Sequence, residues 1–105
     1  MSAIDFLKKL PAAFDASGAA GTEAIVQFNI SSPAHIVIKG GACSLVEGSA
    51  ANADVSLTME DDDLVSLLKG DLNGMTAFMT GKLQLDGDMM LAQRMTSFFD
   101  ASKLG

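Results

Sequence analysis

Two side chains of the kind used in nucleophilic catalysis occur in the first half of the chain, His35 and Cys43, the single histidine and the single cysteine of the sequence. A histidine that removes the proton of a nearby thiol would give a Cys–His enzyme. The surrounding alternation, however, places His35 on the polar side of a strand, and a lone cysteine is most often a small buried hydrophobe. We therefore expect a protein without catalytic residues, with a Cys43/His35 enzyme as an alternative.

Acidic residues gather in two places, at Asp61-Asp62-Asp63 and at Asp86 and Asp88. Carboxylates at this spacing could bind a divalent cation, but both groups precede expected helices, where carboxylates stabilise the helix N-terminus. Neither group matches the calcium-binding loop of EF-hand proteins, and the glycines form neither a P-loop nor a G-x-G-x-x-G fingerprint. We expect no metal and no cofactor.

Length, charge and cysteine content bound the class of protein. The chain has 105 residues and a formal net charge of −6 at pH 7, which fits a single domain, residues 1–105. The negative charge disfavours a nucleic-acid partner and limits membrane contact to transient encounters at most. A lone cysteine cannot form an intramolecular disulfide, which suits a reducing compartment. We expect neither a signal peptide nor a membrane span.

The elements that must position these residues follow from hydrophobic periodicity. Apolar residues recur at helical spacing over residues 3–14, and Pro11 should divide that helix into a short helix and a further turn. The Gly40-Gly41 pair supplies a tight turn between two alternating segments. Period-two alternation predicts three strands in hairpin order, over residues 24–30, 35–39 and 43–46.

The second half of the chain mixes strands with helices. Residues 47–54 are too few for a crossover helix and should carry the chain across the sheet. A strand, two short helices, a strand and a final helix should follow, over residues 55–59, 61–69, 71–80, 83–85 and 88–99.

We predict an α+β fold in the order α-β-β-β-β-α-α-β-α. Its five-stranded, mostly antiparallel sheet should be covered on one face by helices, and the helices between the fourth and fifth strands would allow these two strands to pair in parallel. All methionines but the initiator lie from Met59 onward. Thioethers and phenyl rings are polarizable and need no hydrogen bonds, so this composition permits an apolar cavity, although it is also common in ordinary cores.

Three segments of the second half closely resemble the sterol carrier protein 2 domain: residues 53–59 (ADVSLTM), 62–67 (DDLVSL) and 77–89 (AFMTGKLQLDGDM). The most specific piece runs from Gly81 to Met89. The first half agrees with the family mainly in the order of its elements.

The resemblance implies a non-enzymatic carrier with an apolar cavity between sheet and helices. The implied ligand is a fatty acid, a fatty acyl-CoA, a phospholipid or a sterol-like lipid. We expect the lipid tail to lie against a helical face made by Leu68, Leu72, Met75, Phe78, Met79, Leu91, Met95, Phe98 and Phe99.

Two features depart from the family pattern. The family often carries basic residues suited to acyl-CoA phosphates or anionic membranes, whereas this chain is acidic and has Asp88 where members commonly have asparagine. The tripeptide Ser102-Lys103-Leu104 resembles a peroxisomal signal but is followed by Gly105, so we expect a cytoplasmic protein. The alternative function is a protein–protein interaction module with no internal ligand, whose apolar face docks a lipid-metabolism enzyme or a second copy as a homodimer.

Overall fold

A computed structural model describes residues 3–15, 17, 21–95 and 98–100, so that the C-terminal residues 102–105 lie outside the described part of the chain. The predicted α+β fold is confirmed, and the helix predicted over residues 3–14 is divided in two. Pro11 stands in the first turn of the second piece, where its missing N–H is tolerated. The elements are α1 (Ala3–Leu7), α2 (Leu10–Ala13), β1 (Ala24–Asn29), β2 (Ala34–Lys39), β3 (Ala42–Glu47), β4 (Val55–Thr58), α3 (Asp61–Lys69), α4 (Gly74–Met79), β5 (Gln84–Gly87) and α5 (Met89–Met95).

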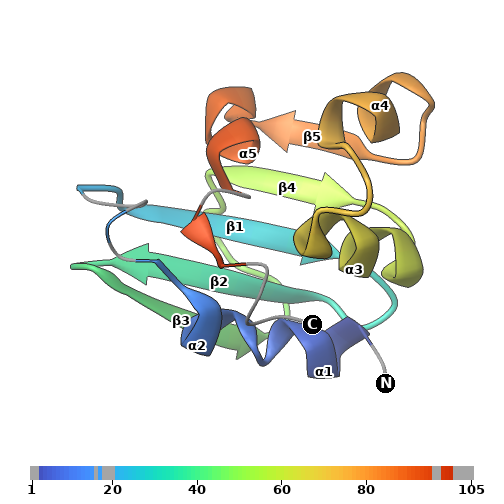
Figure 1. The fold of residues 1–105 in the computed structure, drawn as a ribbon. Coiled ribbons are helices and arrows are strands. Elements are labelled where there is room, and N and C mark those ends of the chain that lie inside the picture. The colour runs from blue at the N-terminus through green and yellow to red at the C-terminus, as the bar shows by residue number, and fades with distance from the viewer. Residues whose placement is uncertain (1–2, 16, 18–20, 96–97, 101–105) are drawn as a thin grey trace.

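The five strands form one sheet in the order β3-β2-β1-β4-β5 (Figure 1). The β1–β2, β2–β3 and β4–β5 pairs are antiparallel, and β1–β4 is parallel. The prediction that β4 and β5 could pair in parallel is wrong. Two helices connect β4 to β5, and β5 runs in the opposite direction to β4. The parallel pair is β1–β4, which forms because the chain crosses the sheet between β3 and β4.

The crossing segment, residues 48–54, is held to the face of the sheet opposite the helices. The Gln27 side chain is buried there, accepts the N–H of Ala50 at 2.7 Å, and donates to two backbone carbonyls. The Asp54 carboxylate accepts the N–H of Ile25 at 2.7 Å. These bonds satisfy polar groups that the crossing chain covers, and they fix the register at which β4 starts.

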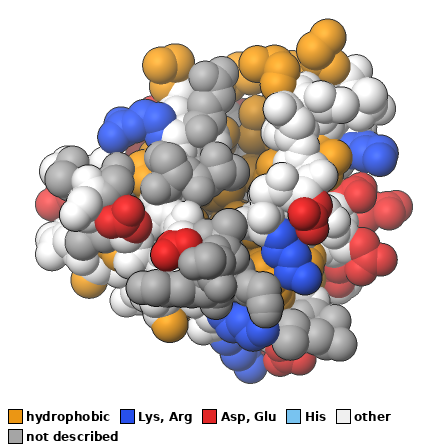
Figure 2. Space-filling model, in the orientation of Figure 1, with side chains coloured by type: hydrophobic (Ala, Val, Ile, Leu, Met, Phe, Trp, Pro, Cys, Tyr) orange, Lys and Arg blue, Asp and Glu red, His pale blue; other side chains and the backbone are white. Residues whose placement is uncertain are grey.

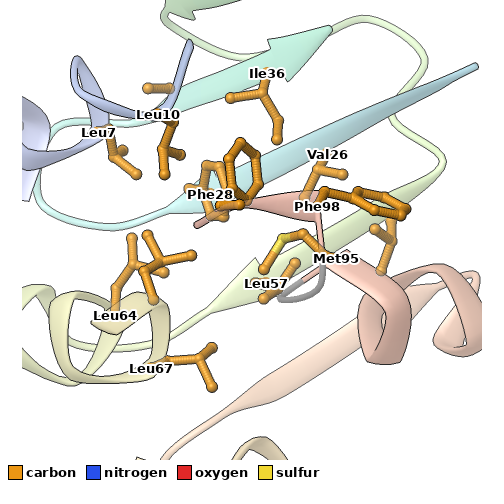
Figure 3. Close-up of a cluster of buried hydrophobic side chains, with 14 of the residues drawn as sticks. Leu7, Leu10, Val26, Phe28, Ile36, Leu57, Leu64, Leu67, Met95 and Phe98 are labelled. Carbon is orange, nitrogen blue, oxygen red and sulfur yellow. The ribbon is translucent and has the colours of Figure 1, made fainter. Parts of the chain in front are cut away.

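The core lies between the sheet and the helices that cover its other face. Alternate residues of β1 and β2 are buried on this face, as period two predicts, and Gln27 of β1 is buried on the other face. Figure 3 shows Phe28 at the centre of this core, with Leu7 and Leu10 approaching from α1 and α2 and Leu64 from α3. Among the described residues, no helix is both long and apolar enough to cross a membrane.

The last two phenylalanines are not part of α5: Phe98 lies in a 3₁₀ turn and Phe99 in a β-bridge. Phe99 forms an isolated antiparallel bridge with Phe14, the two rings meet edge to face with centroids 5.9 Å apart, and the N–H of Asp15 donates to the carbonyl of Phe98 at 2.6 Å. The prediction of a helix that continues to Phe99 is therefore wrong at Phe99, which pairs with Phe14 of the N-terminal segment instead.

The acidic run precedes and opens α3, as predicted. Asp61 accepts hydrogen bonds from the N–H and the hydroxyl of Ser31, and these bonds lower the pKa of its carboxyl. Because the folded pKa is the lower one, this link stabilises the fold above the ordinary pKa of aspartate and is lost as pH falls through the lowered value. Within the ranges that the structure describes, no three His, Cys, Asp or Glu side chains come together as a metal site.

Candidate ligand-binding pocket

A pocket of about 450 Å³ opens between the β4–β5 edge of the sheet, the α3–α4 connection, α4 and the start of α5. This volume falls within the range of small-molecule sites. Figure 2 shows hydrophobic side chains gathered at the top of the molecule around α4 and visible within the hollow beside it. The pocket is lined by Leu57, Leu67, Gly70, Leu72, Asn73, Gly74, Met75, Phe78, Leu83, Leu85, Met89 and Ala92.

The floor of the pocket comes from the two strands at this edge of the sheet. Leu57 of β4 stands directly opposite Leu85 of β5 in the antiparallel register, so both side chains project to the face that the helices cover. Leu83, just before β5, is buried beside them. The alternation of β4 and β5 therefore places leucines in the pocket and polar residues on the other face.

One wall of the pocket is built by the turn between α3 and α4. Gly70 ends α3 in the left-handed conformation at φ 85°, which suits glycine. Asn73 caps α4 by accepting the N–H groups of Met75 and Thr76 at 2.8 and 3.2 Å. This cap fixes the direction of α4, so that Met75 and Phe78, one helical turn apart, both line the pocket.

The opposite wall is the first turn of α5. The Asp88 carboxylate accepts the N–H of Leu91 at 3.0 Å, and the Asp88 N–H donates to the Asp54 carbonyl at 2.9 Å. The predicted N-cap of α5 is thereby confirmed, and the hydrogen bond to Asp54 ties this cap to the crossing segment. Met89 and Ala92, three residues apart, line the pocket, whereas Leu91 belongs to the core.

The nine residues predicted to bind the lipid tail occupy three different environments. Leu72, Met75 and Phe78 line the pocket. Met79 is exposed and outside it. The other five are buried in the core cluster rather than in the pocket wall: Leu68, Leu91, Met95, Phe98 and Phe99. Figure 3 shows Met95 and Phe98 among the core side chains around Phe28.

Two parts of the pocket lining lie outside the predicted set of residues: the strand contribution and the second face of α5. Strand alternation could have identified Leu57 and Leu85, since the two residues lie on one face of the antiparallel β4–β5 pair. Met89 and Ala92 carry no comparable signal, because α5 is apolar on more than one side. Their place depends on how the Asp88 cap rotates the helix.

The pocket lining is chemically simple. Of the described side chains that form it, none is charged, and Asn73 is the single amide among aliphatic, thioether and phenyl groups. Such a lining excludes water from an apolar molecule and offers it flexible contact surface, with little scope for acid–base chemistry. The arrangement can hold hydrocarbon.

His35 and Cys43 do not form a catalytic pair. In the β2–β3 register His35 lies opposite Val46, whereas Cys43 lies opposite Ile38, so the two side chains project from opposite faces of the sheet. The Nδ1 of His35 lies 3.0 Å from the carbonyl oxygen of Gly48. Burial raises the pKa of the Cys43 thiol to about 11.

We expect Cys43 to react slowly with iodoacetamide. With its pKa near 11, only roughly one thiol in a thousand is ionised at pH 8, and alkylation should be about a hundredfold slower than in urea-unfolded protein. The measurement is the labelling rate by mass spectrometry from pH 6 to 10, with the unfolded protein as control. A rate that levels off near pH 8 would show an activated thiol and contradict the structure.

The fold and the pocket can be compared with known proteins. The family model described as the SCP-2 sterol transfer family matches residues 6–100. The chain belongs to this family. The resemblance seen in three segments of the sequence is thereby confirmed and extends over nearly the whole chain.

Relatives in this family include proteins much longer than this chain. "Sterol carrier protein 2" of Bos taurus is 41% identical over 58 residues, which span 55% of this chain and 11% of the relative. "Oleate-induced peroxisomal protein POX18" of Candida maltosa is 41% identical over 61 residues, 58% of this chain and 48% of the relative. The matched part thus spans between about a tenth and a half of these relatives.

Solved structures share the fold of this family member. The sec-alkylsulfatase Pisa1 from Pseudomonas sp. matches with a TM-score of 0.81 and 21% identity over 87% of this chain and 15% of that chain. Palmitated SCP2L2 from Aedes aegypti matches with a TM-score of 0.70 and 24% identity over 91% of this chain and 92% of that chain. The same fold therefore occurs both as most of one chain and as a small part of a larger enzyme.

Proposed function

We propose that this protein is a non-enzymatic lipid carrier, in which residues 1–105 act as one domain and the pocket beside α4 encloses the apolar part of the ligand. The observation that carries the proposal is the apolar cavity of about 450 Å³ in the fold of a sterol transfer family. The separation of His35 and Cys43 on opposite faces of the sheet supports a carrier without a catalytic step.

The proposed ligand is a lipid with a long hydrocarbon portion, such as a fatty acid, a fatty acyl-CoA, a phospholipid or a sterol-like molecule. Burial of about a dozen methylenes would contribute about 10 kcal/mol, and association costs of at least about 4 kcal/mol leave affinities of tens of micromolar. The palmitated neighbour and the oleate-induced relative, by their names, point to fatty acyl chains.

We place this carrier in the cytoplasm, with membrane contact limited to transient ligand exchange. The acidic net charge of −6 opposes stable binding to anionic membranes, and the single cysteine suits a reducing compartment. A lipid-metabolism enzyme is the protein partner that such a carrier would supply.

Native mass spectrometry of the purified protein, followed by organic extraction, tests the function. A stoichiometric adduct that delipidation removes and added palmitic acid restores is the expected result. A clean apo mass that takes up no fatty acid, acyl-CoA or phospholipid would refute the carrier. If that apo mass also doubled with concentration, the alternative function as an interaction module would be supported instead.

A further inference from the structure

The exposed methionines of the described residues are concentrated around the pocket. Met75 and Met89 line it and are 58% and 44% exposed, so they stand at its mouth. Met79 and Met90 are 77% and 68% exposed but do not line it. Four solvent-accessible thioethers on α4 and α5 are thus divided into two at the mouth and two beside it.

The remaining sulfur atoms of the described residues are much less accessible. Met59 and Met95 are buried in the core. Cys43 packs against that core from β3, and its protonated thiol reacts weakly with oxidants. An oxidant in solution therefore meets the thioethers around the pocket first.

We propose that Met75 and Met89 are a reversible oxidation site, at which a peroxide converts both thioethers to sulfoxides and thereby weakens lipid binding. This inference rests on the proposed carrier function and assigns it a form of regulation.

The reaction balances with a peroxide as the named oxidant. The thioether sulfur attacks one peroxide oxygen, the S–O bond forms as the O–O bond breaks, and the second oxygen leaves as water or an alcohol. Sulfur loses two electrons and the peroxide gains them. A methionine sulfoxide reductase reverses the step with electrons from a thiol.

The change in polarity explains the effect on binding. A sulfoxide carries a strong hydrogen-bond acceptor, which a bound hydrocarbon would cover without satisfying it. Because Met75 lies on α4 and Met89 on α5, oxidation places such acceptors on two opposite walls of the pocket. We expect lipid affinity to fall about tenfold or more.

Matched double variants test this inference. Leucine conserves apolar volume and cannot be oxidised in this way, so the affinity of Met75→Leu/Met89→Leu for palmitic acid should be the same before and after treatment with hydrogen peroxide. Met79→Leu/Met90→Leu removes the two more exposed thioethers outside the pocket and should still lose about tenfold in affinity. Peptide mass spectrometry measures sulfoxide at each position, with Met59 and Met95 as buried internal controls.

The outcomes separate the inference from the function on which it rests. Restored affinity after treatment with a methionine sulfoxide reductase supports the inference. Unchanged affinity when Met75 and Met89 are fully oxidised overturns it, as does a loss of affinity that follows Met79 and Met90 instead. If the untreated protein binds no lipid of any class, the carrier function itself fails and this inference fails with it.

Discussion

Replacing Ala92 with phenylalanine should weaken lipid binding by at least about tenfold while leaving the domain folded. Ala92 is half-buried on α5 and lines the pocket, so a phenyl ring at this position occupies space that the ligand needs. Displacement of only two methylenes from the cavity costs about 1.6 kcal/mol, more than tenfold in affinity. Calorimetric titration with palmitic acid measures the change in affinity.

Ala12→Phe is the matched control for this substitution. Ala12 is exposed on α2, and α2 lies on the opposite side of the molecule from α4 and the pocket (Figure 1). The control adds the same ring to a helix and should bind palmitic acid like the unchanged protein. Equal affinities for both variants, with circular dichroism showing both folded, would mean that the ligand lies elsewhere.

Gly87→Ala should destabilise the domain by about 4 kcal/mol, a large part of the stability of a small protein. Gly87 has φ 108°, and a Cβ atom at this position would lie 2.4 Å from the Asp54 carbonyl oxygen. Both the left-handed backbone and the close approach of β4 therefore require glycine. Because backbone atoms form the obstacle, relief needs the β4–β5 pair to move.

Gly41→Ala separates these two causes. Gly41 also has positive φ, at 77°, but a Cβ atom there would have no neighbour within 4 Å. Gly41→Ala should lower the free energy of unfolding by about 1 kcal/mol, from backbone strain alone. Urea unfolding of both variants gives the comparison, and equal losses of stability would show that the contact with Asp54 is unimportant.

Local signals in the sequence were sufficient for most individual elements. The alternation at Val26 and Phe28 identified a strand and its buried face, because period two needs no information from distant residues. Asp88 was recognisable as an N-cap from its side-chain chemistry and from the hydrophobic residues that follow. The resemblance around Gly81 to Met89 added the family and the element order, which the family match confirms.

Features that depend on distant partners were not predictable in this way. The parallel β1–β4 pair requires the crossing segment to dock on Gln27, a contact that neither strand encodes alone. Phe99 is not helical as expected, because it forms an antiparallel bridge with Phe14. Both features come from long-range pairing, which local periodicity does not encode.

The pocket shows the same limit at the level of single side chains. Spacing alone groups Leu91 and Met95 with Met75, since all are apolar residues on amphipathic helices. Packing divides them, because α5 turns Leu91 and Met95 toward the core and leaves Met89 and Ala92 facing the cavity. A helix that is apolar on two sides gives no sequence signal for which side meets the ligand.

A carrier that works as we propose holds its lipid chain in the pocket between α4 and α5. The most direct test is NMR spectroscopy of protein carrying ¹³C-methyl methionine, with measurement of NOEs to the methylenes of bound palmitic acid. A lipid chain in this pocket should give NOEs to the methyl groups of Met75 and Met89. NOEs confined to Met95 would place the lipid in the core between the sheet and the helices instead. The absence of any NOE to Met75 and Met89 in a saturated complex would show that the lipid does not lie in this pocket.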